Sequence, residues 1–158
     1  MKLQHLRNYA IASLYLAAAA HMLVALVLVC CADSALLQSY HDAILPGFFA
    51  AQVPQQAQAL QAWWMQLFGA TLECLSIWMA SLIWLGAQQR KPAIWLCLIF
   101  GLLIWAPQDI WLSLRAGVWS HVWVDLLALG LILPPLCLLW RIDRHAEQAQ
   151  PQAVGSST

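Results

Sequence analysis

The chain has 158 residues, of which 63% are hydrophobic and only 9% are charged. Soluble domains carry about a quarter charged residues, so this composition excludes an ordinary water-soluble domain and indicates an integral membrane protein. The seven basic and seven acidic residues cancel, and a chain without net positive charge gives no electrostatic reason to expect a nucleic-acid partner. The length suits a single compact domain.

The first apolar segment follows a short basic start at residues 1–8 and covers residues 9–32. A helix of about 24 residues is long enough to cross a hydrocarbon core of about 30 Å. A cleaved signal peptide has a shorter apolar core of about 7–15 residues and ends in a small-residue cleavage site. This segment instead ends in Cys30-Cys31-Ala32-Asp33, so we predict a membrane helix over residues 9–32.

Residues 33–59 form the longest predicted connection, which carries His41 and Asp42. Its apolar patch at residues 43–51 is too short to cross a bilayer. Such a patch is compatible with a segment that lies in the membrane interface or dips into it. It is equally compatible with an ordinary loop that caps the helices, and both interpretations stay open.

Three further apolar segments are long enough to cross a membrane, and tryptophans flank the first of them as expected at membrane interfaces. We predict helices over residues 60–86, 93–114 and 119–140. The polar segment at residues 141–158 is predicted to be a disordered tail. The expected fold is therefore all-α, an integral membrane four-helix bundle in which residues 9–140 form one transmembrane domain.

The distribution of basic residues predicts the orientation, because cytoplasmic segments of membrane proteins are enriched in lysine and arginine. With the amino terminus in the cytoplasm, only Arg115 falls outside. The six basic residues on the cytoplasmic side are then Lys2, Arg7, Arg90, Lys91, Arg141 and Arg144. We therefore expect both termini in the cytoplasm, residues 33–59 outside, and a bacterial inner membrane as the simplest location.

Ionisable residues within membrane helices are costly, so each one is a candidate for a functional role. His21 and Glu73 both fall near the middle of their predicted helices. Small residues beside them allow close approach of the two helices. A His–Glu hydrogen bond could fix the register of the helices, or the pair could relay protons or bind a ligand.

A second group of ionisable residues lies near the outer ends of the last two helices. Asp109 and Asp125 are at similar depth, His121 is one helical turn from Asp125, and Arg115 lies in the turn above them. One interpretation is that Arg115 and His121 neutralise the aspartates at the interface. The other is a cation or proton site.

The same group could supply three metal ligands, with His41 or Asp42 as a fourth. The spacing of Asp109, His121 and Asp125 matches no strong metal-binding motif, so no metal is our first expectation. Haem is also disfavoured, because His21 and His121 lie on the order of 15 Å apart in depth. We therefore predict no cofactor.

Short motifs suggest a family resemblance that covers the layout of residues 9–140. They are Ala62-Trp63-Trp64 before Glu73, Lys91-Pro92-Ala93-Ile94 at the start of the third helix, and Leu133-Pro134-Pro135-Leu136 in the fourth. With four helices and a long first outer loop, the chain resembles two groups of small membrane proteins, the DoxX-like family and the emopamil-binding and sigma-2 receptor family. The second resemblance implies a bundle that encloses a lipid or sterol pocket lined by acids.

Three functional hypotheses follow, and a non-enzymatic protein is favoured. The first is a protein that binds a lipid-like or quinone-like apolar molecule, or a partner helix, through its intramembrane acids. The second is a small proton- or cation-coupled transporter or channel subunit that uses Glu73, Asp109 and Asp125. The third is a membrane enzyme in which His121 and the two aspartates act as acid and base. Membrane lipid is an expected partner in each case, and the small size is compatible with a homo-oligomer or a subunit of a membrane complex.

Overall fold

The structure is a computed structural model that describes residues 2–49 and 53–149, and these residues form helices and turns without any strand. Five α-helices and one short 3₁₀ helix follow one another along the chain. They are α1 (Lys2–Cys31), η1 (Ala35–Leu37), α2 (Gln38–Phe48), α3 (Gln55–Gln89), α4 (Pro92–Arg115) and α5 (Trp119–Ala149). The predicted all-α fold is confirmed.

Three of the predicted helices are longer in the structure than the sequence indicated. Helix α1 begins at Lys2 and α3 at Gln55, and α5 continues to Ala149, so residues 141–149 are not the expected disordered tail. Residues 150–158 of that prediction lie outside the described residues. The reason is that the apolar pattern marks only the part of a helix that suits hydrocarbon. Lysine, glutamine, glutamate, arginine and alanine favour helix just as well in water.

Helices α1, α3, α4 and α5 are each long and apolar enough to cross a membrane, and no other helix in the described part of the chain is. Their outward faces carry many large exposed apolar side chains, such as Leu16, Trp123 and Leu131. A water-soluble protein rarely exposes continuous apolar surface of this kind. The four helices therefore have the surface expected of membrane-spanning segments.

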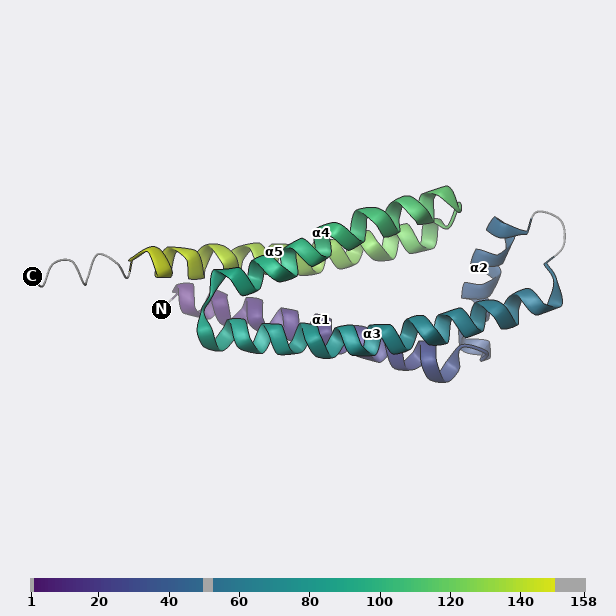
Figure 1. The fold of residues 1–158 in the computed structure, drawn as a ribbon, viewed down its shortest axis with the longest axis horizontal. Coiled ribbons are helices and arrows are strands. Elements are labelled where there is room, and N and C mark those ends of the chain that lie inside the picture. The colour runs from purple at the N-terminus through teal and green to yellow at the C-terminus, as the bar shows by residue number, and fades with distance from the viewer. Residues whose placement is uncertain (1, 50–52, 150–158) are drawn as a thin grey trace, which may run out of the picture.

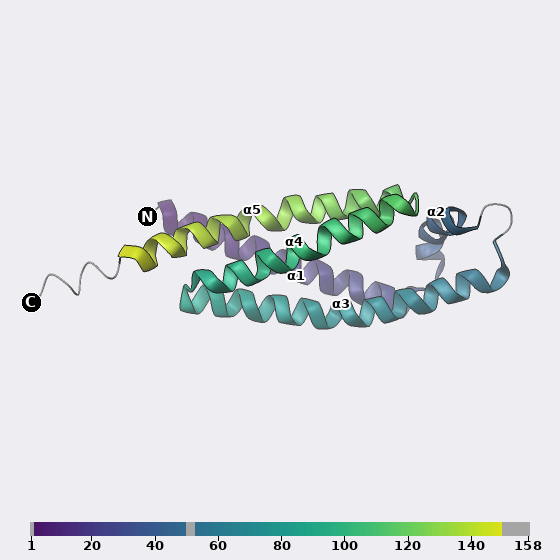
Figure 2. The same ribbon diagram turned by 45° about the horizontal axis from the view of Figure 1, so that its top comes forward.

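The four long helices are arranged as two antiparallel pairs, α1 with α3 and α4 with α5. Gly69 allows close packing in the first pair, because a Cβ atom there would lie 2.9 Å from the Ala25 carbonyl oxygen. Figures 1 and 2 show that α1 begins and α5 ends at the same end of the molecule, next to the α3–α4 turn. Toward the other end, where α2 lies, the α4–α5 pair diverges from the α1–α3 pair.

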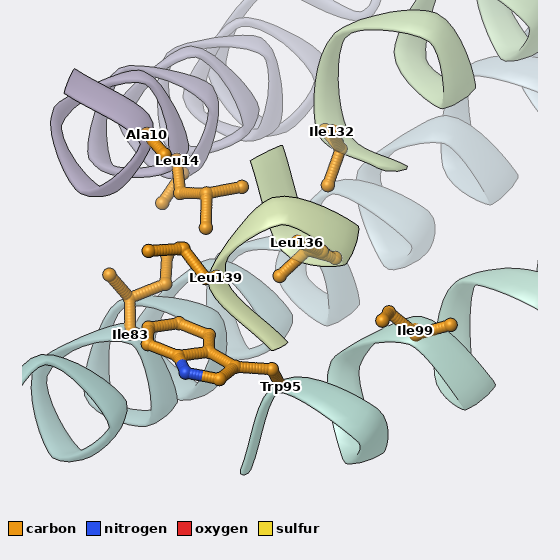
Figure 3. Close-up of a cluster of buried hydrophobic side chains, with 9 residues drawn as sticks. Ala10, Leu14, Ile83, Trp95, Ile99, Ile132, Leu136 and Leu139 are labelled. Carbon is orange, nitrogen blue, oxygen red and sulfur yellow. The ribbon is translucent and has the colours of Figure 1, made fainter. Parts of the chain in front are cut away.

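The two pairs meet in a core near the α3–α4 turn, to which all four long helices contribute (Figure 3). Leu14, Ile83, Trp95 and Leu139 are completely buried there. Lipid is as apolar as leucine, so burial of these side chains gives little hydrophobic gain in a bilayer. Close packing and interhelical hydrogen bonds must hold the helices together instead.

Beside this core, a buried ion pair links the beginning of α1 to the end of α5. Arg7 Nε donates to Asp143 Oδ1 at 3.0 Å, and Trp95 Nε1 of α4 donates to Asp143 Oδ2 at 2.8 Å. Arg7 Nη2 also donates to the carbonyl oxygens of Gly86 and Ala87 in α3, each at 3.2 Å. We call Arg7, Trp95 and Asp143 the terminal latch, because its hydrogen bonds reach all four long helices.

Candidate functional site

A cluster of ionisable side chains lies at the end of the molecule opposite the terminal latch. Asp109, His121 and Asp125 each present one ligand atom within 4.8 Å of the others. His121 Nδ1 lies 3.6 Å from Asp109 Oδ1 and 3.0 Å from Ser113 Oγ. We call Asp109, His121 and Asp125 the polar cluster.

The α4–α5 hairpin explains this grouping. The two helices are antiparallel and meet in a short turn in which Gly117 has a φ of +72°, a conformation that favours glycine. Residues equally distant from this glycine therefore lie level with each other, which places Asp109 opposite Asp125 and Ser113 opposite His121. Ser113 was not among the predicted site residues, although the symmetry of the hairpin was a signal that could have found it.

Asp125 is the most deeply buried member of the polar cluster, with only 2% of its surface exposed. Its Oδ2 atom has no hydrogen-bond partner among residues 2–49 and 53–149. Arg115 is exposed, and its Cζ atom lies 4.8 Å from the centre of the Trp111 ring. In the part of the chain that the structure describes, no ion pair joins Arg115 to an aspartate. Of the two residues expected to neutralise the aspartates, His121 lies beside Asp109, whereas Arg115 forms no ion pair with either aspartate in the described residues.

Helix α2 lies against the same end of the α4–α5 hairpin. A Cβ atom on Gly47 would lie 2.6 Å from the Ala116 carbonyl oxygen, so only glycine permits this approach. Burial raises the pKa of Tyr40, and the negative charges of Asp109 and Asp125 raise it further. Tyr40 is therefore within electrostatic range of the polar cluster and remains a neutral hydrogen-bond donor above its usual titration range.

The two loop residues predicted as a fourth metal ligand have other roles. His41 is completely buried, and its Nε2 donates to the Ala32 carbonyl oxygen at 2.8 Å, which ties α2 to the end of α1. Asp42 is exposed and accepts a hydrogen bond from Gln38 Nε2 at 2.9 Å. Neither residue belongs to the group of ligand atoms formed by the polar cluster.

An apolar cavity of about 500 Å³ lies between the two diverging helix pairs. All four long helices line it, and its size is within the range of ligand pockets, about 300–1,000 Å³. The lining includes His21, Trp78, Gly101, Trp105 and Ile132. Gly101 leaves part of this space open, because a Cβ atom there would have no neighbour within 4 Å.

The cavity offers very little hydrogen bonding. The hydroxyl groups of Thr71 and Ser76 donate to the carbonyl oxygens one turn earlier in their own helix. His21 Nδ1 is 2.8 Å from the Ala17 carbonyl oxygen and must donate to it. In the neutral imidazole, Nε2 is then an acceptor. His21 is therefore a lining residue that can accept a hydrogen bond, beside the indole N–H groups of Trp78 and Trp105, which can donate one.

The cavity and the polar cluster lie on the same faces of α4 and α5. Trp105 lines the cavity and Asp109 follows one turn later, while Ile132 lines it and Asp125 lies two turns away on the same face. At 1.5 Å per residue, these steps are about 6 Å along α4 and about 10 Å along α5. The polar cluster therefore lies just beyond the cavity, in the direction of the α4–α5 turn.

His21 and Glu73 are not joined by a hydrogen bond or an ion pair in the described residues. His21 bonds to its own helix and lines the cavity, whereas Glu73 is half-buried and is not a lining residue. The expected hydrogen bond between them is therefore not formed, although both residues are on neighbouring helices.

No protein family model, curated protein or solved structure matches this chain. The resemblance in layout to the DoxX-like and emopamil-binding families stays an expectation from the sequence.

Proposed function

We propose that this protein is a multi-pass protein of a bacterial inner membrane, with both termini in the cytoplasm, that binds a lipid-like or quinone-like apolar molecule between its helices. The location is supported by four apolar helices and by the six-to-one distribution of basic residues described above. The observation that carries the binding role is the apolar cavity of about 500 Å³ that all four long helices line.

The lining of the cavity defines the chemistry of the ligand. Trp78, Trp105 and Ile132 suit a hydrocarbon or ring-containing body. The acceptor at His21 Nε2 suits a hydroxyl group on that body, because a hydrogen bond in an apolar site has no competition from water. The polar cluster lies where a head group at one end of the ligand would reach it. An amphiphilic alcohol, such as the reduced form of a quinone or a polycyclic alcohol, has this combination of groups.

Filling the cavity provides the test. Gly101 and Gly130 are both exposed helix glycines at which an added Cβ atom meets no neighbour within 4 Å, but only Gly101 lines the cavity, so Gly101→Leu would fill part of it and Gly130→Leu would not. The two variants thus change a helix glycine in the same way. We expect native mass spectrometry in mild detergent to detect one bound small molecule on the wild type and on Gly130→Leu, and a strongly reduced bound fraction on Gly101→Leu.

A wild-type protein that carries no small molecule and binds no added amphiphilic alcohol would contradict the proposed function. Equal retention by Gly101→Leu and Gly130→Leu would contradict the assignment of the ligand to this cavity. A bare protein of discrete oligomeric state would instead favour the transporter or complex-subunit hypothesis.

A further inference from the structure

We propose that Asp109, His121 and Asp125 bind one divalent transition-metal ion near the α4–α5 turn. The metal site uses only the polar cluster, none of whose residues lines the apolar cavity, so it does not require a bound cavity ligand, although it shares the cluster with the proposed head group. It reverses the expectation from sequence spacing, because spacing along the chain does not reveal how an antiparallel hairpin groups side chains.

The first argument is charge. The polar cluster places two carboxyl groups and one imidazole within 4.8 Å of one another. Asp125 is almost completely buried, and its Oδ2 atom has no partner among the described residues. A buried carboxylate without a partner is strongly unfavourable. The nearest arginine in sequence, Arg115, stacks on Trp111 instead. A bound divalent cation would balance the charge of the two carboxylates and give Asp125 Oδ2 a partner.

The second argument is geometry. Metal–ligand bonds to nitrogen and oxygen are about 2.0–2.2 Å long, so the ligand atoms of a tetrahedral site are about 3.3–3.6 Å apart. The three ligand atoms of the polar cluster lie within 4.8 Å of each other. Side-chain rotations that bring the most widely separated of these atoms closer by up to about 1.5 Å would therefore complete a three-ligand site.

Two further features of the polar cluster bear on metal binding: the contact of His121 with Ser113 and the partial exposure of His121 and Asp109. His121 Nδ1 lies 3.0 Å from Ser113 Oγ, so an ion bound through Nε2 would keep this hydrogen bond, whereas an ion bound through Nδ1 would displace it. The side chains of His121 and Asp109 are 29% and 21% exposed, which leaves a path for an ion to enter. Asp125 then forms the buried side of the site.

The ligand types select the class of metal. Calcium and magnesium prefer oxygen ligands alone, and copper(I) prefers thiolate and thioether sulfur. One imidazole with two carboxylates instead suits Zn²⁺, Mn²⁺, Fe²⁺ or Co²⁺. Three protein ligands leave at least one coordination position for water or for another molecule.

Cobalt titration tests this site, because Co²⁺ bound to imidazole and carboxylate absorbs visible light. Protein without a polyhistidine tag would be titrated in detergent with Co²⁺, and bound Co²⁺ would then be displaced with Zn²⁺. We expect saturation at one Co²⁺ per chain and displacement by one Zn²⁺. His121→Gln and Asp125→Asn should each weaken binding at least tenfold. The matched control Asp42→Asn, which changes an exposed aspartate outside the polar cluster, should bind like the wild type.

Stability measurements distinguish a variant that has lost the metal site from one that does not fold. Each variant would be compared by far-UV circular dichroism and thermal unfolding, and Asp109→Asn would replace Asp125→Asn if the latter does not fold. Added Zn²⁺ should raise the unfolding temperature of the wild type but not of the site variants. A wild type that binds neither metal, or site variants that bind as tightly as Asp42→Asn, would overturn the proposal and show that protons or water balance the charge of the cluster.

Discussion

The terminal latch provides the most direct test of what holds the two helix pairs together. Replacing Arg7 with methionine keeps an unbranched side chain of similar length but removes the guanidinium group. Asp143 then loses two hydrogen bonds and its counter-charge, and retains only the bond from Trp95 Nε1. The carboxylate stays buried, because side-chain exposure is 4% for Arg7 and 0% for Asp143.

The expected magnitude follows from this burial. Breaking a buried ion pair by removing one partner costs about 3–5 kcal/mol. This corresponds to a decrease of about 10²- to 10⁴-fold in the folding equilibrium constant. The double variant Arg7→Met/Asp143→Leu removes both charges and should recover a large part of that loss, because it leaves no unpaired charge in the core. Trp95 would still lose its acceptor, at a cost of about 1–3 kcal/mol.

Equilibrium unfolding in mixed micelles, followed by circular dichroism, would measure these differences. The matched control is Glu147→Gln, because Glu147 forms a 3.8 Å ion pair with Lys91 near the same end of the molecule, with side-chain exposures of 54% and 62%. An exposed ion pair contributes about 0–1 kcal/mol, so this control should be close to the wild type. If Arg7→Met is no less stable than Glu147→Gln, or if the double variant is less stable than Arg7→Met, the latch does not hold the helix pairs together.

Three further predictions concern single side chains. The pKa of Tyr40 is raised above 10.0 in the folded protein. The wild type should therefore lose stability as pH rises from about 10 through that raised pKa. Tyr40→Phe should remove this loss when thermal unfolding is compared at pH 9 and pH 11. Gly86→Ala should lower the free energy of unfolding by about 1–3 kcal/mol, because its Cβ atom would lie 2.6 Å from the buried Trp95 ring. Gly130→Ala places its Cβ atom where no neighbour lies within 4 Å, so it should be neutral or slightly stabilising in the same unfolding assay. His21→Leu should weaken binding of a hydroxylated amphiphile about tenfold in a competition assay, and it should leave binding of the methyl ether of that amphiphile unchanged. An equal effect on both ligands would exclude the acceptor role of His21 Nε2.

The sequence alone determined the all-helical fold and the number of helices that are long and apolar enough to cross a membrane. Both follow from local chemistry, because a backbone in hydrocarbon must satisfy its own hydrogen bonds and about 20 apolar residues are needed to cross the core. Depth along each helix was also readable, and it correctly placed Asp109 and Asp125 at the same level. The ends of the helices could not be predicted in this way, because polar residues such as Lys2 and Glu147 extend α1 and α5 beyond the apolar pattern.

The tertiary structure decided which side chains meet. His21 and Glu73 lie on neighbouring helices, yet no described hydrogen bond joins them. Arg7 was counted only among the basic residues expected on the cytoplasmic side, and Asp143 was not a predicted site residue, yet the two form the buried ion pair of the latch. The physical reason is that spacing along a helix gives a residue's height but not the rotation of that helix about its axis. The rotation is set by packing against all neighbours at once, which also determines that the two helix pairs diverge and leave a cavity between them.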